Sequence, residues 1–418
     1  MIPLQRIRDE PDVIREGARL KGEEAPVDEI LDLDGRAREL RTAMEALRAE
    51  QNLLGKSLRG APTPEQRAEL EDLKTRIRDA ENELRELDPR IEELLLAVPN
   101  PPHPTVPVGR DENGNVVVRT WGEPKGFDFE PLPHYDIGER TGVFDFERAA
   151  RISGARFAVL CGGGARLQRA LIAHFLDSAI ARGYSEVAPP YLVRREAMVG
   201  TANLPKFEGD FYETNDDLYL IPTAEVPVTN LYREEILEPG TLPIRHVAFT
   251  PCWRREAGAA GKDTRGYIRM HQFDKVELVK FVEPETSLDE LEGLVADAEA
   301  VLQDLGLHYR VLLMCTGDMG FAQWKKYDLE AWAPGMRRWL EVSSCSVFAD
   351  FQARRMNLRY RPAPQERPQF PHTLNGSALA VPRTLDAVLE TYQRADGSVD
   401  IPDVLQPYMA GTQRIVPR

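Results

Sequence analysis

The sequence predicts an α+β protein in which an N-terminal antiparallel two-helix coiled-coil arm precedes a larger domain with an antiparallel β-sheet flanked by helices. Three observations lead to this prediction: a heptad pattern over about 28–98, a proline-rich run at 99–107, and short β-type runs after it. Heptads are typical of coiled coils. Strand-like runs without regular crossover helices favour antiparallel pairing. We therefore expect an N-terminal domain over 1–98, a linker over 99–107 and a second domain over 108–418.

Apolar residues of the arm recur alternately three and four residues apart, which is the spacing of a coiled-coil seam. In the first helix these positions are Leu33, Ala37, Leu40, Met44, Leu47, Gln51 (the one polar member), Leu54 and Leu58. In the second helix they are Leu70, Leu73, Ile77, Ala80, Leu84, Leu87, Ile91, Leu94 and Val98. The short turn at 60–64 requires the two helices to run antiparallel. Thr63 and Gln66 predict a capping box at the second helix, and Pro89 predicts the local loss of one helical hydrogen bond and a kink.

The second domain alternates helical and strand-like patterns. Amphipathic helices are expected at 161–182 and 285–305. Strands are expected at 217–221, 245–256, 267–281, 308–313, 338–349 and 376–381.

The composition excludes several classes of protein. The chain has 418 residues, 42% of them hydrophobic, enough for sizeable cores. It has no run of about 18 apolar residues and no signal-peptide pattern, so we expect no membrane association and a cytoplasmic location. The spacing of its four cysteines and seven histidines fits no zinc site or disulfide framework. A net charge of −15 argues against nucleic-acid binding by bulk attraction, but it leaves a local basic strip possible.

The stretch 249–278 carries side chains of the kinds that a nucleotide needs. Arg254 and Glu256 are two residues apart, and Arg269, Phe273 and Glu277 follow at intervals of four. Period-two strands place each set on one face. An arginine offers a bidentate fork to phosphate, an aromatic ring stacks on a base, and a carboxylate accepts from an amine. From spacing alone, a sheet with surface ion pairs explains the pattern equally well.

The same stretch resembles motif 2 of the class II aminoacyl-tRNA synthetases, and in particular of the seryl-tRNA synthetase family. The resemblance is carried by CWRREAGAAGKDTRGYIRMHQFDKVEL at 252–278. GYSEVAPP at 183–190 resembles motif 1, with Pro190 as its proline, and NGSALAVPR at 375–383 resembles motif 3. The family signatures Thr-Ala-Glu and Glu-Val-Ser-Ser stand at 223–225 and 341–344. The resemblance spans essentially the whole chain, and it implies a class II catalytic domain over 108–418.

The resemblance also implies roles for individual residues. The implied ATP-binding residues are Arg254, Glu256, Met270, Phe273, Glu341, Val342, Ser343, Ser344 and Arg383, of which Arg254, Glu256 and Arg383 are implied to be catalytic. The implied serine-binding residues are Thr223, Ala224, Glu225, Arg254, Glu277, Asn375 and Ser377. Mg²⁺ is implied to bind with ATP at Glu341 and Ser344. Two residues three apart point to opposite faces of a regular strand, so this last assignment requires a bulge, a strand end, or a bridging phosphate or water.

The implied activity is that of a serine–tRNA ligase, which makes seryl adenylate from serine and ATP and then acylates tRNA(Ser) and tRNA(Sec). The family forms homodimers around motif 1, and its arm reaches the long variable arm of tRNA. Candidate phosphate contacts on the arm are Arg36, Arg41, Arg48, Lys56, Arg59, Lys74, Arg76 and Arg78, although a solvated charged face explains each of them as well. Two alternatives are a seryl-activating homologue that charges a carrier protein and a non-catalytic coiled-coil scaffold. The arm argues against the first, and retention of Arg254, Glu277 and Arg383 argues against the second.

Overall fold

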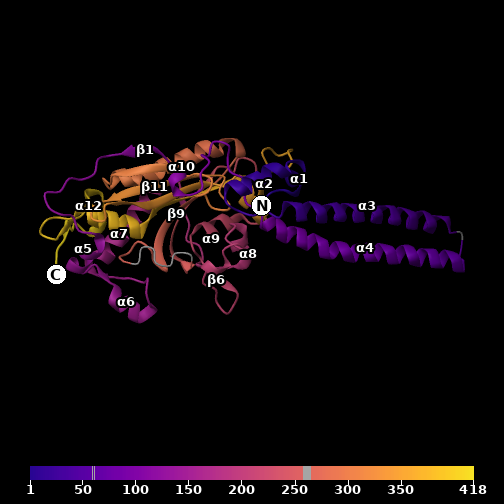
Figure 1. Cartoon of the computed structure of the whole chain (residues 1–418), viewed down its shortest axis with the longest axis horizontal. Helices are drawn as coiled ribbons and strands as arrows, with labels where there is room; N and C mark the ends of the chain where they lie inside the picture. Colours follow the sequence, from indigo (N-terminus) through magenta and orange to yellow (C-terminus); the bar gives the residue numbers. More distant parts are fainter. Residues whose placement is uncertain (59, 61, 258–264) are drawn as a thin grey trace. The chain divides into compact units, whose positions relative to one another are not determined.

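The computed structural model describes residues 1–58, 60, 62–257 and 265–418, and it divides into two compact units, Met1–Pro101 and Pro102–Arg418. The first unit is helical. It consists of α1 (Leu4–Asp9), α2 (Pro11–Leu20), α3 (Val27–Ser57) and α4 (Pro64–Leu96). The second unit contains the sheet, so the predicted α+β class with an N-terminal helical arm is confirmed (Figure 1). In the described part of the chain, no helix is both long enough and apolar enough to cross a membrane.

Helices α3 and α4 run side by side as an antiparallel pair (Figure 1). Glu29 pairs with Arg90 at 2.9 Å, and farther along α3, Arg48 pairs with Glu81 at 2.6 Å, so the two helices progress in opposite directions. The predicted seam is buried at its centre, where Leu47 packs with Leu73 and Ile77. The predicted capping box at the start of α4 is present. Helix α4 continues through Pro89.

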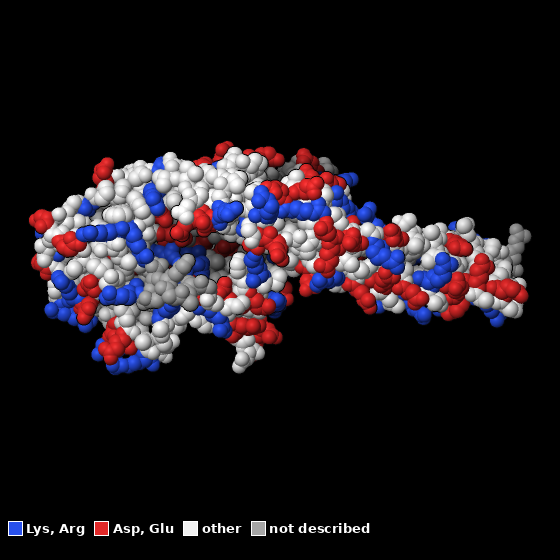
Figure 2. Space-filling view, viewed as in Figure 1, with Lys and Arg blue, Asp and Glu red and all other residues white. Residues whose placement is uncertain are grey.

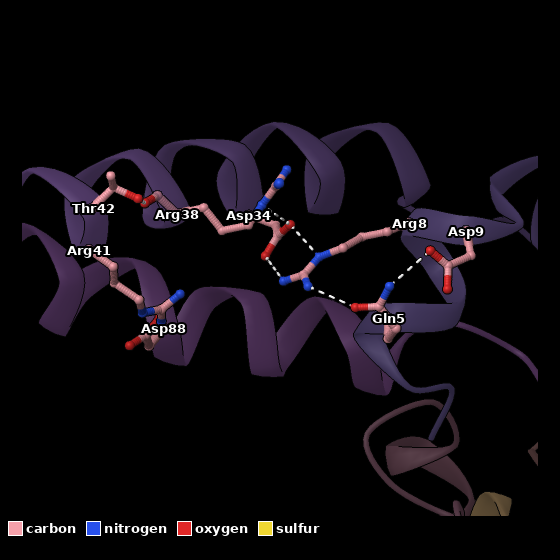
Figure 3. Close-up of polar contacts among 8 residues, drawn as sticks. All are labelled: Gln5, Arg8, Asp9, Asp34, Arg38, Arg41, Thr42 and Asp88. Atoms are coloured by element: carbon pink, nitrogen blue, oxygen red, sulfur yellow. Dashed lines mark hydrogen bonds and ion pairs between the residues drawn. The ribbon is translucent and has the colours of Figure 1, made fainter.

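The heptad pattern does not predict a buried carboxylate in α3. Asp34 has a side chain only 1% exposed, and it accepts two hydrogen bonds from Arg8 of α1 at 2.7 and 2.5 Å (Figure 3). Arg38 donates a third hydrogen bond at 3.1 Å. The Arg8 guanidinium holds the pKa of Asp34 below its ordinary value. This bidentate pair ties α1 to α3, because it joins Arg8 to a buried carboxylate through two charge-assisted hydrogen bonds.

An eight-stranded sheet forms the centre of the second unit. In spatial order its strands are β1 (Val116–Trp121), β10 (Tyr309–Leu313), β11 (Lys325–Ala333), β12 (Arg338–Val347), β14 (His372–Ala380), β9 (Gln272–Val282), β8 (Ile244–Trp253) and β4 (Ser185–Glu186). Neighbouring strands are antiparallel except β4 and β8, which are parallel. The predicted antiparallel sheet is therefore confirmed.

One face of this sheet is covered by helices, and the other is partly open. Helices α7 (Gly162–Ala181), α10 (Ser287–Asp304) and α12 (Val381–Tyr392) share one hydrophobic core with the sheet. Val276, Leu278 and Val282 of β9 point into this core, so alternation turns Lys275 and Glu277 to the opposite face. There α9 (Glu225–Thr229) and α11 (Phe351–Met356) cover part of β8 and β9 through a second apolar cluster.

Shorter elements complete the second unit. They are α5 (His134–Thr141), β2 (Phe144–Asp145), α6 (Phe146–Ser153), β3 (Val159–Leu160), β5 (Leu192–Arg194), α8 (Arg195–Gly200), β6 (Leu218–Leu220), β7 (Ile236–Leu237), β13 (Arg359–Tyr360), β15 (Val399–Asp400) and β16 (Arg414–Ile415).

The predicted elements match the structure except at the ends of three strands, of which the strand expected at 376–381 is β14, which starts earlier, at His372, and ends at Ala380. The helices expected at 161–182 and 285–305 are α7 and α10. The strands expected at 245–256 and 267–281 are too long, because β8 stops at Trp253 and β9 starts at Gln272. Glu256 has a φ of +52°, a left-handed conformation that a strand does not contain. The predicted elements include no counterpart of β1 or β11.

Candidate functional site

A cavity of about 380 Å³ opens on the face of the sheet opposite α7, α10 and α12. Its walls come from β9, β11, β12 and β14, from the ends of β8, α9 and α12, and from the segment before β9. The residues that line it are Thr223, Glu225, Arg254, Glu256, Ile268, Arg269, Met270, Phe273, Lys275, Glu277, Gln323, Lys326, Glu341, Val342, Ser343, Ser344, Ser346, Asn375, Ser377, Ala380, Pro382 and Arg383. Every candidate for binding ATP or serine is among them except Ala224, whose side chain packs in the apolar cluster beneath α9.

Arg254 is fixed at the end of β8 by its own backbone. Its N–H donates to the carbonyl of His271 at 2.9 Å, and its carbonyl lies 3.0 Å from Nδ1 of the His271 ring. Its side chain donates to the carbonyl of Pro222 at 3.3 Å and lies over the ring of Phe273, 5.2 Å from the centroid. The cation therefore lies against the aromatic ring on one wall of the cavity.

Glu256 and Arg269 face each other across the mouth of the β8–β9 hairpin. A guanidinium nitrogen of Arg269 lies 2.6 Å from a carboxylate oxygen of Glu256. The sequence predicts that both residues lie within strands, but β8 ends at Trp253 and β9 starts at Gln272, so strand alternation does not place them. The positive φ of Glu256 turns the chain back toward the cavity.

Arg383, in the first turn of α12, joins three parts of the site. One guanidinium nitrogen donates to the carbonyl of Glu341 at 2.8 Å and lies 3.3 Å from its carboxylate. The Nε of Arg383 donates to the carbonyl of Ile268 at 3.3 Å. Burial raises the pKa of Glu341, but Arg383, Lys326 and Arg254 outweigh burial and hold it below its ordinary value.

The buried His134 of α5 holds the segment before β9 from behind. The backbone N–H of Tyr267 donates to Nε2 of His134 at 3.3 Å, and Nδ1 of His134 lies 2.8 Å from a carboxylate oxygen of Glu390 on α12. Gly266 lies so close that a Cβ there would be 2.0 Å from Nε2 of His134. The segment that contributes Ile268 and Met270 to the cavity is therefore anchored to α5 and α12.

Two carboxylates and an amide form the innermost wall. Nδ2 of Asn375 donates to Glu225 at 3.0 Å and to Glu277 at 2.7 Å. Lys275 forms an ion pair with the other oxygen of Glu277. Burial and the charge of Glu277 raise the pKa of Glu225 to about 7. This wall suits a cationic ligand with hydrogen-bonding groups, since carboxylates accept and do not donate.

A β-bulge in β12 places Glu341 and Ser344 on the same side. Leu329 of β11 pairs with Ser343, whereas its neighbour Glu330 pairs with Glu341, so Val342 is the extra residue. The irregularity that the implied Mg²⁺ site requires is thus present, and both residues line the cavity. A carboxylate with a lowered pKa beside a hydroxyl suits a hard cation that is also held by phosphates.

Sequence reasoning missed several lining residues. Strand alternation could have identified Lys275, because this residue lies two positions from both Phe273 and Glu277. It could not have identified Lys326, because the sequence analysis did not predict β11. Lys326 is paired with Asp328 at 3.1 Å, and burial raises the pKa of that carboxylate. The other missed residues are Ile268, Gln323, Ser346, Ala380 and Pro382. Pro190 lies outside the cavity, after β4, with its side chain exposed.

Comparisons with known proteins agree with this geometry. Residues 1–102 match the family model described as the seryl-tRNA synthetase N-terminal domain, and residues 206–392 match the tRNA synthetase class II core domain (G, H, P, S and T). A serine–tRNA ligase of Thermomicrobium roseum is 57% identical, over 99% of this chain and 95% of the relative. The serine–tRNA ligase of Geobacter sulfurreducens is 50% identical, over 99% of this chain and 100% of the relative.

Solved structures give the same result. Seryl-tRNA synthetase from Pyrococcus horikoshii, solved with ATP, is 40% identical with a TM-score of 0.96, and the match covers 100% of both chains. The cytoplasmic serine–tRNA ligase of Naegleria fowleri, solved with AMP, is 30% identical with a TM-score of 0.91, over 100% of this chain and 99% of that one. The chain therefore belongs to the seryl-tRNA synthetase family, the serine–tRNA ligases of class II.

Proposed function

We propose that the cavity binds ATP and L-serine together, makes seryl adenylate, and then transfers the seryl group to the 3′-terminal adenosine of tRNA(Ser). The observation that carries the proposal is the division of one cavity into two chemically different halves. Arg254, Phe273 and Arg383 form a cationic and aromatic half suited to a nucleotide, and Glu225 with Glu277 forms an anionic half suited to an ammonium group. A purine triphosphate and an amino acid need these two kinds of surface side by side.

Activation requires the serine carboxylate to attack the α-phosphorus of ATP while pyrophosphate leaves. Arg254 binds the α-phosphate and the serine carboxylate, which brings the reactants together and stabilises the charge that develops on the phosphoryl oxygens. Phe273 stacks on adenine, Glu256 accepts from its amino group, and Arg383 covers the opposite face of the base and reaches the γ-phosphate. The Ile268 carbonyl and Glu341, which accept from Arg383, hold that guanidinium in place.

Glu341 and Ser344 are the residues that would hold Mg²⁺ with the ATP phosphates. Among the residues with a described position, no group of three or more His, Cys, Asp or Glu side chains forms a metal site. A site of one carboxylate, one hydroxyl and substrate phosphates is the kind that Mg²⁺ accepts, since this ion binds proteins through few side chains. When bound, Mg²⁺ supplies positive charge to the triphosphate. Val342 and Ser343, which lie between these two residues, line the same edge of the cavity.

Serine is selected by the anionic half of the cavity. Glu225 binds the ammonium group, and Glu277 binds the hydroxyl and the ammonium, while Thr223, Asn375 and Ser377 complete the polar pocket. A pocket built to bind a hydroxyl rejects alanine, because its own polar groups are then left unpaired. Threonine must be rejected by lack of space for its methyl group.

The partners belong to the same proposal. The N-terminal unit binds tRNA(Ser), and also tRNA(Sec) where this exists, through the arm. A homodimer forms around 183–190, where Pro190 lies. Figure 2 shows acidic and basic side chains interspersed along the arm. Arg36, Arg41 and Arg48 pair with carboxylates of α4, so these cations would have to exchange partners when they contact phosphate. Arg59 lies outside the described residues. A cytoplasmic location follows from this role in translation.

Serine-dependent ATP–pyrophosphate exchange tests the proposal, with threonine and alanine as controls. Replacing Arg254 by alanine is expected to lower the exchange rate by about 100- to 1,000-fold, the usual effect of losing one group that stabilises developing charge. Arg255→Ala is the matched control, because the neighbouring guanidinium binds the Phe211 carbonyl and does not line the cavity. Absence of exchange with every amino acid, in a folded wild-type protein, would overturn the proposal.

A further inference from the structure

Two buried side chains lie behind Glu225 and outside the cavity. Gln352 of α11 is 1% exposed and Thr373 of β14 is fully buried. Nε2 of Gln352 donates to one carboxylate oxygen of Glu225 at 2.7 Å, and the hydroxyl of Thr373 donates to Oε1 of Gln352 at 2.6 Å. The other oxygen of Glu225 accepts from Asn375, two residues beyond Thr373 on the same strand. Each oxygen of Glu225 is therefore held by an amide.

Only one orientation of the Gln352 side chain satisfies both neighbours. The ionised carboxylate of Glu225 accepts hydrogen bonds and cannot donate them, so above the pKa of this group the NH₂ of Gln352 must face Glu225. The reversed amide would bring two oxygens to 2.7 Å, which is repulsive. The Thr373 hydroxyl has a single proton, which it gives to Oε1 of Gln352. Thr373 therefore fixes the amide, and the amide fixes the carboxylate.

Gln352, held by Thr373, also offsets part of the electrostatic cost of ionising Glu225. Burial and the nearby charge of Glu277 both disfavour an ionised Glu225, whereas the hydrogen bond from Gln352 favours it. Lys275 on β9 and Arg254 after β8 are the cations that act on Glu225, and Asn375 is the neutral bridge to Glu277. Gln352 is thus a donor to Glu225 that leaves the cavity side of the carboxylate to the substrate.

We propose that Gln352 and Thr373 are positioning residues, which hold the Glu225 carboxylate toward the ammonium group of serine and so set serine affinity without touching the substrate. Neither lines the cavity. The inference rests on the proposed role of Glu225 and goes beyond it, because it assigns a specificity function to two residues in the layer behind the site. No part of it involves the nucleotide half of the cavity.

The Thr373→Val variant tests the inference with almost no change in side-chain volume. In ATP–pyrophosphate exchange we expect its KM for serine to rise about tenfold, the equivalent of one orienting hydrogen bond, and its KM for ATP to stay within about twofold. Thr373→Ser keeps the hydroxyl and should restore the serine KM. The matched control is Thr141→Val in α5, which removes another buried hydroxyl, one that is bonded to the Ile137 carbonyl at 2.8 Å and does not line the cavity.

A pH profile separates positioning from general damage. In Gln352→Met the donor is lost while Glu277 stays, so protonation of Glu225 becomes easier. The acidic limb of kcat/KM for serine should then move to higher pH, whereas a variant that is only misfolded loses rate equally at every pH. This second variant keeps the inference testable if Thr373→Val does not fold, which a thermal melt would reveal.

The outcomes distinguish this inference from the function it rests on. If Glu225→Gln raises the serine KM but Thr373→Val and Gln352→Met leave both the KM and the pH profile unchanged, the positioning role is wrong and the proposed function stands. If Glu225→Gln itself leaves the serine KM unchanged, the proposed role of Glu225 is wrong, and the role of the pair with it. An equal rise in the KM for serine and in the KM for ATP would also overturn the positioning role.

Discussion

At the scale of single residues, the site depends on charges that are held close together in a buried place. Glu225 and Glu277 share the amide of Asn375, and Lys275 pairs with Glu277. Two buried carboxylates that accept from the same amide tend to share a proton unless cations or donors offset their repulsion. Under the proposed function, the ammonium group of serine would supply that positive charge.

Wild-type serine affinity should depend on pH because of Glu225. Burial and Glu277 raise the pKa of this carboxyl to about 7. As pH falls through that value Glu225 gains a proton, loses its charge and binds ammonium less well, whereas above it the carboxylate is fully charged. We expect kcat/KM for serine to fall about tenfold per unit below the pKa, with a much smaller change for ATP. Exchange assays from pH 5.5 to 8.5 measure this, and a flat profile across about pH 7 would contradict it.

At the scale of secondary-structure elements, irregular backbone decides where functional groups point. The bulge at Val342 turns Glu341 and Ser344 to one side, and because β9 starts only at Gln272, the segment 266–271 can follow the cavity wall. That segment is held from behind, since Tyr267 donates to His134 and Ile268 accepts from Arg383. The nucleotide half of the cavity therefore depends on the packing of a non-regular segment against α5 and α12.

Gly266 is the position at which this packing is most sensitive. Its φ is +82°, and a Cβ would lie 2.0 Å from Nε2 of His134. Gly266→Ala should raise the KM for ATP by about tenfold or more. Backbone strain and overpacking would cost about 1–3 kcal/mol, and the segment 266–271 would shift to relieve them. Gly240→Ala is the matched control, with a similar φ of +77° and open space around its Cβ. Equal ATP KM values in the two variants would show that the contact with His134 does not matter.

At the scale of the whole molecule, the chain combines two units that bury separate cores. The catalytic cavity lies entirely within Pro102–Arg418, and the arm lies entirely within Met1–Pro101. The residues proposed to contact ATP and serine can therefore be complete without the arm. The two steps of the reaction should for this reason respond differently to changes in the arm.

Shortening the arm should affect tRNA charging without affecting activation. Arg48 and Glu81 pair at 2.6 Å, so a short glycine-rich turn can replace residues 49–80 and join the two helices. We expect pyrophosphate exchange within about twofold of wild type, and a KM for tRNA(Ser) raised at least tenfold, on the order of what losing several phosphate contacts costs. Charging rates measured against tRNA concentration test this, with circular dichroism as the check on folding. Unchanged charging would show that the arm beyond Arg48 does not bind tRNA.

The sequence by itself determined the parts of this protein that repeat or alternate locally. The heptads located α3 and α4, the capping box marked the start of α4, and alternation along β9 put Phe273 and Glu277 on one face. These features follow from helix and strand periodicity, which neighbouring residues express without distant contacts. The motifs, recognised as a family pattern, identified the chemistry as well.

Only the tertiary structure decided how distant segments complete the site. The bulge at Val342 exists because β11 and β12 pair out of step, and Lys326 enters the cavity from β11, which local pattern did not reveal. The same holds for Gln352 and Thr373, which meet Glu225 from α11 and β14. Such contacts join residues of different elements, as far apart in the chain as Glu225 and Gln352, and their geometry is set by packing and sheet register, which no local periodicity encodes.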